Sequence, residues 1–100
     1  MEHIIVKTFW SHDSDLCNVQ MPIVKNVQEI FGNRVIFEDI KAEENQDMIS
    51  EYNIKEFPTI IIELGGKERE RFIGLTQERF LRRALKRIMS ERYESLSRRV

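Results

Sequence analysis

The amino-acid sequence predicts an α/β fold: a four-stranded mixed sheet flanked by helices, in the order βαβ-α-ββα. Two observations lead to this prediction. Short runs rich in β-branched and aromatic residues, typical of buried strands, alternate with longer stretches whose apolar residues recur every three or four positions, typical of helices. A pair of glycines, Gly65-Gly66, then separates two strand-like segments, as expected for a hairpin with a two-residue loop.

Length and composition restrict the class of protein. One hundred residues with 41% hydrophobic and 33% charged side chains are expected to form one globular domain. The formal net charge of −1 gives no general reason to expect nucleic acid or a membrane surface as a partner. No apolar run approaches the roughly 18 residues that a membrane-spanning helix needs. We expect no cofactor. We expect residues 1–91 to form the domain and residues 92–100 a C-terminal helix extension or tail.

The first unit is predicted as strand, helix, strand. Residues 3–9 and 35–40 form the strands, and a helix fills residues 15–31 between them. Pro22 lies inside that helix and is expected to kink it rather than end it, because the apolar periodicity resumes beyond it. The predicted buried stripe consists of Leu16, Val19, Ile23, Val27, Ile30 and Phe31. A unit of this length implies parallel strands joined by a right-handed crossover.

The second half is predicted as helix, hairpin, helix. A short polar helix covers residues 41–52, and the hairpin strands cover residues 59–64 and 67–73. The second hairpin strand is almost entirely polar, which suits a solvated edge. Thr76 is the expected N-cap of the last helix. Its predicted apolar side consists of Phe80, Leu81, Ala84, Leu85, Ile88 and Met89.

Several matched segments carry a resemblance to a known family. They are Phe9-Trp10, Ser14-Asp15-Leu16-Cys17, Pro22, the segment from Ile54 to Thr59, and Gly74. Their order and spacing over residues 3–90 resemble the thioredoxin family, in its shorter, glutaredoxin-sized form. The resemblance implies a thioredoxin-like fold with a cis-proline at Pro58.

The resemblance also implies that the redox site is degenerate. Ser14-Asp15-Leu16-Cys17 falls where the family has two cysteines separated by two residues. Ser14 takes the place of the attacking cysteine, and Cys17 that of the resolving one. The family's buried carboxylate falls at Thr8, which cannot act as a base. We therefore expect no dithiol–disulfide reductase activity, although whether the protein is an enzyme of another kind stays open.

Cys17 has three interpretations. The first is a small buried hydrophobic residue, a common state for a free cysteine. The second is a reactive monothiol that forms a mixed disulfide or a glutathione adduct, making the protein a thiol–disulfide oxidoreductase. The third is that Ser14 replaces a natural cysteine, which would make the protein an ordinary dithiol enzyme. With one cysteine and no N-terminal basic-then-apolar segment, the expected location is the cytoplasm.

A binding surface is expected beside Pro58. In the family, the residues that match Trp10, Phe57, Pro58 and Gly74 lie along a shallow surface where an extended peptide binds. The predicted partner of this chain is accordingly a protein or peptide. The alternative is that Trp10 and Phe57 only cover the edge of the core.

A metal site is not expected. His12, Asp13, Asp15 and Cys17 carry ligand atoms, but a tight structural site would need a second pair elsewhere, and only His3 remains. His12 is interpreted as a solvated loop residue.

The last helix carries a basic side formed by Arg79, Arg82, Arg83, Lys86 and Arg87. It lies opposite the apolar stripe and has no interleaved aromatic residues, so we interpret it as a solvated face and expect no nucleic acid. Tyr93, Leu96 and Val100 extend the apolar side, which leaves a homodimer through this helix as a possibility.

Overall fold

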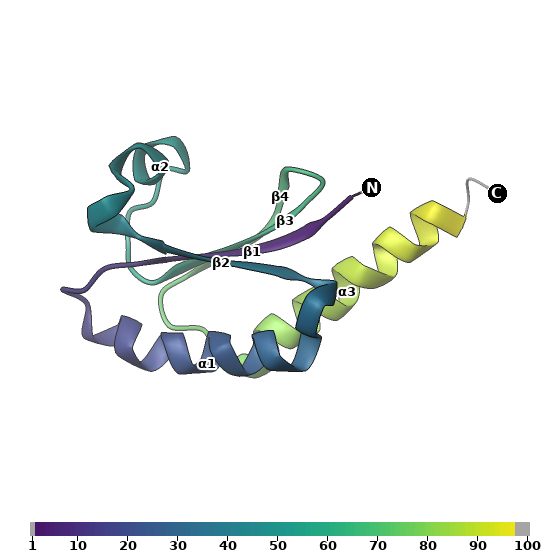
Figure 1. Ribbon diagram of the computed structural model, residues 1–100, viewed down its shortest axis with the longest axis horizontal. Coiled ribbons are helices and arrows are strands. Elements are labelled where there is room, and N and C mark those ends of the chain that lie inside the picture. The colour runs from purple at the N-terminus through teal and green to yellow at the C-terminus, as the bar shows by residue number, and fades with distance from the viewer. Residues whose placement is uncertain (1, 98–100) are drawn as a thin grey trace.

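A computed structural model describes residues 2–97 and confirms the predicted order of elements (Figure 1). The strands are β1 (Ile4–Trp10), β2 (Ile36–Lys41), β3 (Thr59–Leu64) and β4 (Lys67–Ile73). The helices are α1 (Asp15–Phe31), α2 (Gln46–Glu51) and α3 (Glu78–Ser97), with short 3₁₀ turns η1 (Gly32–Arg34) and η2 (Ala42–Glu44).

The four strands form one mixed sheet in the order β2-β1-β3-β4. β1 runs parallel to β2 and antiparallel to β3, and β3 pairs with β4 in an antiparallel hairpin. β1 is therefore central, and Thr8 lies between Asp39 on one side and Ile60 on the other. The hairpin loop is Gly65-Gly66 as predicted, and both glycines have positive φ angles of 59° and 81°.

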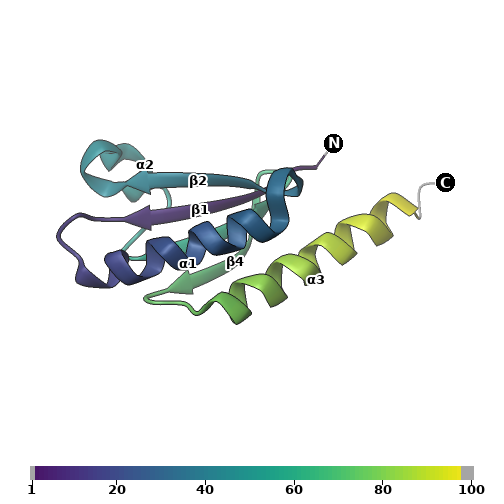
Figure 2. The same ribbon diagram turned by 60° about the horizontal axis from the view of Figure 1, so that its bottom comes forward.

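The helices cover the two faces unequally: α1 and α3 lie on one face and α2 on the other (Figures 1 and 2). The α1/α3 face buries a large apolar cluster built from β1, β3 and both helices. The α2 face buries a smaller one, formed by Phe9, Ile40, Ile54 and Ile61. Residues of β1 alternate between the two clusters, as the period of a strand requires.

The predicted buried stripe of α1 is wrong at several positions. Leu16, Val19 and Ile30 are exposed. The side that faces the sheet instead consists of Cys17, Gln20, Val24, Val27 and Phe31. The predicted and the observed residues both recur every three or four positions, so either set could form the apolar side of a helix. Packing against the sheet determines which side is buried. α1 does continue past Pro22, as expected.

Three smaller expectations are also wrong. The predicted helix over residues 41–52 is split into η2 and α2. Thr76 precedes α3 and does not cap it; its hydroxyl donates to the carbonyl oxygen of Gly74, 3.2 Å away. Phe80 is exposed, although it was placed on the buried side.

α3 is a continuous helix whose C-terminal turns project beyond the sheet (Figure 2). Ion pairs join it to β4: Arg69 contacts Glu91, and Arg87 contacts Glu70 at 3.3 Å. Tyr93 is 72% exposed on the projecting part. The side chain of Leu96, and Val100, lie outside the described residues. Within residues 2–97, no helix has the length and apolar character to cross a membrane.

Candidate functional site

Three loops meet at one end of the sheet and bring together Ser14, Pro58 and Gly74. The hydroxyl of Ser14 donates to the carbonyl oxygen of Phe57 at 3.2 Å. The backbone N–H of Gly74 donates to the carbonyl oxygen of Pro58 at 2.8 Å. The Phe57–Pro58 peptide bond is cis. The Ser14–Phe57 contact spans 43 positions of the chain, and the Pro58–Gly74 contact spans 16. Segments that are far apart in the sequence thus lie together at this end of the sheet.

Gln20 fixes the third loop, and the sequence interpretation missed it. Its side-chain amide donates to the carbonyl oxygen of Thr76 at 3.0 Å and accepts from the Thr76 N–H at 2.7 Å. Gln20 is completely buried on the inner side of α1. A buried amide needs partners for both its donor and its acceptor, and the backbone of Thr76 supplies both. A polar residue within a buried helical stripe is the signal that could have revealed it.

Cys17 is buried on the inner side of α1, with 1% of its surface exposed. Its N–H donates to the carbonyl oxygen of Ser14 at 3.1 Å, in the first turn of the helix. Ser14 occupies the N-cap position, but its side chain makes no capping hydrogen bond. The Ser14 hydroxyl contacts the loop that contains Pro58 instead.

Trp10 and Phe57 are both half-buried at the ends of the same loops. The Nζ of Lys41 lies 5.6 Å from the ring centre of Trp10, within the range of a cation–π contact. The indole N–H of Trp10 is buried and has no hydrogen-bond partner among the described residues. Phe57 packs against the apolar cluster on the α2 face. Trp10 therefore takes no part in the hydrogen bonds that join the three loops.

Exposed apolar side chains surround this junction. Leu16 and Val19 project from the first turns of α1, and Ile73 and Leu75 flank Gly74. Each has between 43% and 61% of its surface exposed. We call these four residues the apolar rim. Since Gln20 binds Thr76, the first turns of α1 and the Gly74 loop are held side by side.

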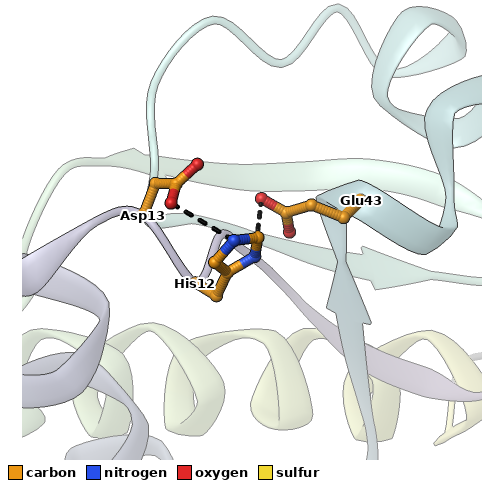
Figure 3. A group of neighbouring side chains, drawn as sticks. All are labelled: His12, Asp13 and Glu43. Atoms are coloured by element: carbon orange, nitrogen blue, oxygen red, sulfur yellow. Dashed lines mark ion pairs between the residues drawn. The ribbon is translucent and has the colours of Figure 1, made fainter.

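His12 lies between two carboxylates at the outer side of the loop (Figure 3). Its Nε2 is 3.2 Å from Asp13, and its Nδ1 is 3.2 Å from Glu43. The Ser11 hydroxyl donates to Glu43 at 2.6 Å, and this hydrogen bond is the main reason that the pKa of Glu43 is lowered. The two ring nitrogens of His12 therefore face different carboxylates, one from the same loop and one from η2.

The structure groups His12 differently from the sequence interpretation. Glu43, from η2, was not among the candidate metal ligands, whereas Asp15, Cys17 and His3 were. In the described part of the chain, the group of side chains with metal-ligand atoms close together is His12, Asp13 and Glu43. All three are exposed on the surface.

Thr8 is buried beneath this end of the sheet, with 1% of its surface exposed. Its hydroxyl oxygen has no hydrogen-bond partner among residues 2–97. It faces α1 together with Ile4 and Val6, since alternate residues of β1 share a face. A buried hydroxyl without a partner is uncommon, because its desolvation is then uncompensated.

Comparisons with known proteins agree with this architecture. The family model described as Thioredoxin matches residues 1–87. Thioredoxin M4 of the chloroplast of Arabidopsis thaliana is 26% identical over 87 residues, which are 87% of this chain and 45% of the relative. The thioredoxin of Rickettsia typhi is 26% identical over 77 residues, which are 77% of this chain and 73% of the relative. The chain spans about half the length of the first of these relatives.

Solved structures show the same fold. Thioredoxin-2 of a malaria parasite superposes with a TM-score of 0.83 at 20% identity, covering 86% of this chain and 84% of its own. The thioredoxin of Fasciola hepatica gives a TM-score of 0.78 at 26% identity, covering 85% of this chain and 80% of its own. With a family model that matches most of its length, the chain belongs to the thioredoxin family.

Proposed function

We propose that this domain binds an extended, apolar segment of a protein partner without catalysing dithiol–disulfide exchange. The binding surface would consist of the apolar rim together with Phe57, Pro58 and Gly74. The observation that carries the proposal is the position of the chain's one cysteine. Cys17 is buried, while an alcohol, the half-buried Ser14, stands at the start of α1.

The chemistry supports a loss of dithiol activity. Exchange by a pair of cysteines ends with a disulfide between them, and this chain has only Cys17. The nucleophile in exchange is a thiolate, and the hydroxyl of Ser14 is far too weakly acidic to replace it. The Ser14 hydroxyl is also engaged with the carbonyl oxygen of Phe57. At the position of the attacking cysteine, Ser14 thus forms only a contact with the loop that contains Pro58.

The apolar rim supports a binding role. Soluble domains rarely expose contiguous apolar patches unless these contact something, and single exposed apolar residues carry no such meaning. Here the Gln20–Thr76 hydrogen bonds join the start of α1, which exposes Leu16 and Val19, to the loop that exposes Leu75. The patch lies at the same junction as Pro58 and Gly74. An extended peptide could therefore cover apolar side chains and the backbone of these loops together.

Insulin reduction with dithiothreitol tests the first half of the proposal. The wild-type chain is expected to give no turnover above the dithiothreitol background. A Ser14→Cys variant tests whether the scaffold still supports exchange once a second thiol is present, and Ser14→Ala is its matched control. Clear turnover by the wild-type chain would overturn the proposal.

A peptide library screened against the immobilised domain, followed by calorimetry on the selected peptides, tests the second half. Leu16→Asp and Leu75→Asp are expected to weaken binding at least tenfold, which corresponds to about 1.4 kcal/mol. Ile30→Asp is the matched control, because Ile30 is an equally exposed apolar residue at the other end of α1. Equal losses in all three variants would contradict a site at the apolar rim.

The monothiol alternative requires an accessible Cys17, and its burial argues against it. Reaction with Ellman's reagent at neutral pH measures this directly. The native chain is expected to react slowly and the urea-unfolded chain quickly. Fast reaction of the native chain would instead favour a mixed-disulfide or glutathione mechanism through Cys17.

A further inference from the structure

A pocket of about 430 Å³ opens between α1 and the edge of the sheet formed by β1 and β2. α1 contributes Met21, Pro22 and Val24 to its walls, and β2 contributes Phe37. These walls are mainly apolar, and the volume lies in the range of small-molecule sites. The pocket is separate from the proposed partner surface, because it shares none of the apolar rim, Phe57, Pro58 or Gly74.

Thr8 also lines this pocket, and it supplies the observation that points to a ligand. Its side chain is almost fully buried, and its hydroxyl has no partner among the described residues. In a purely structural position, valine would fill the same space without the cost of an unpaired hydroxyl. A hydroxyl in the lining of an apolar pocket is the kind of single polar group that orients a bound molecule.

The charges at the mouth of the pocket indicate a neutral ligand. Lys25 on α1 and Asp39 on β2 lie on its lining, and both are exposed. Glu38 lies there too, but it is paired with Lys7 at 2.9 Å. Since both signs of charge are present, the mouth favours neither an anion nor a cation strongly.

We propose that this pocket binds a small, neutral, mainly apolar molecule whose single hydroxyl group exchanges a hydrogen bond with Thr8. The apolar body would fill the space between Met21, Val24 and Phe37. The hydroxyl oxygen of Thr8 has almost no accessible surface in this structure, so the ligand's hydroxyl would reach it once a lining side chain moves aside. This site does not depend on the proposed partner surface, so each can fail without the other.

A matched pair of probes, p-cresol and toluene, tests the proposal by ¹⁵N NMR titration of the full chain. Both are expected to shift amide signals of β1, β2 and α1, and p-cresol is expected to bind about fivefold more tightly because one hydrogen bond is added. Thr8→Val should remove that preference while leaving toluene binding unchanged. Lys86→Ala, on the exposed side of α3, should change neither titration.

Three results would overturn the proposal. The first is the absence of any saturable shift with either probe up to its solubility. The second is an undiminished p-cresol preference in Thr8→Val, which would show that the hydroxyl of Thr8 is not the partner. The third comes from a variant that fills the pocket. Met21→Trp, which fills the pocket, should abolish both titrations; a folded Met21→Trp variant that still binds would place the ligand elsewhere. If that variant does not fold, Thr8→Val alone decides.

Discussion

The two faces of the sheet are stabilised in different ways. The α1/α3 face buries thirteen apolar residues in one cluster, and its polar exception in β1, Thr8, has no partner among the described residues. The α2 face buries only four, and beside them lie two charged side chains, Lys7 and Glu63. The smaller apolar cluster, on the α2 face, is thus accompanied by paired polar groups. The larger cluster, on the α1/α3 face, leaves the hydroxyl of Thr8 without a partner among the described residues.

The polar cluster on the α2 face is connected throughout. Nζ of Lys7 lies 2.9 Å from Glu38 and 3.6 Å from Glu63. The hydroxyl of Tyr52 donates to Glu63 at 2.9 Å, and the same ring packs against Phe9 with 5.3 Å between centroids. Buried charges are tolerated when they are paired in this way. Tyr52, the C-cap of the six-residue helix α2, thus connects that helix to β3 through Glu63 and to β1 through Phe9.

The largest expected loss of stability comes from a substitution in the larger apolar cluster, on the α1/α3 face. Leu85→Ala should lower the free energy of unfolding by about 2–5 kcal/mol, because Leu85 of α3 is almost fully buried in the apolar cluster of this face. Met48→Ala, on the half-buried side of α2, should cost about 1 kcal/mol. Urea denaturation followed by circular dichroism measures both. Equal losses of stability in the two variants would mean that the two faces do not differ in this respect.

The next effect comes from the paired charges. Lys7→Met should cost about 2–3 kcal/mol, since it leaves the buried carboxylate of Glu63 without its cation while Glu38 remains partly solvated. Lys7→Met combined with Glu63→Gln should recover most of that loss, because the side-chain oxygen of glutamine still accepts from Tyr52. Urea midpoints of the two variants give the answer. A double variant no more stable than the single one would mean that Lys7 acts through packing alone.

Alkaline pH should weaken the α2 face. Burial lowers the pKa of Lys7, but its hydrogen bond with Glu38 and the charges of Glu63 and Glu38 outweigh burial, so the pKa lies above its ordinary 10.5. Burial, followed by the hydrogen bond to Glu63, raises the pKa of Tyr52 above 10.0. In both cases the folded chain holds its proton longer than the unfolded chain.

The contribution of Lys7 and Tyr52 to stability should therefore be constant up to about pH 9 and fall as the pH rises through 10 and above. Unfolding in urea at pH values from 8 to 11 measures the slope. Lys7→Met combined with Tyr52→Phe should flatten the alkaline part of the curve. If stability falls with pH as steeply in this double variant as in the wild-type chain, groups other than Lys7 and Tyr52 cause the alkaline loss.

The smallest effect concerns the unpaired hydroxyl. Thr8→Val should raise the free energy of unfolding by about 1 kcal/mol, because it removes a buried group that has no partner while keeping the shape. Thr59→Val is the matched control, since Thr59 is equally buried but donates to the carbonyl oxygen of Glu56 at 2.7 Å. The control should lose about 1 kcal/mol. Stabilisation of both variants would mean that the two hydroxyls do not differ.

The order of elements could be predicted from the sequence because strands, turns and helices each leave a local signal. The β-branched runs and Gly65-Gly66 are such signals. The buried side of α1 could not be predicted, because Leu16 and Val19 fit a helical period as well as Cys17 and Gln20 do. Only packing against the sheet distinguishes the two sets.

The candidate site was predictable in part for the same reason. Ser14, Pro58 and Gly74 could be placed together through a resemblance that matches residues one by one. Glu43 and the Gln20–Thr76 pair could not, because their contacts join positions 32 and 56 residues apart and leave no local pattern.

The hydrogen bonds between Gln20 and Thr76 also bear on how the chain is made. Translation completes α1 long before residue 76 emerges from the ribosome, so the amide of Gln20 has neither of its two native partners during that interval. Burying the inner side of α1 before then would leave the donor and the acceptor of this amide unpaired, until the last quarter of the chain arrives. A nascent chain stalled before Thr76 therefore cannot bury its first helix in the native way, even though all four of its strands are already made.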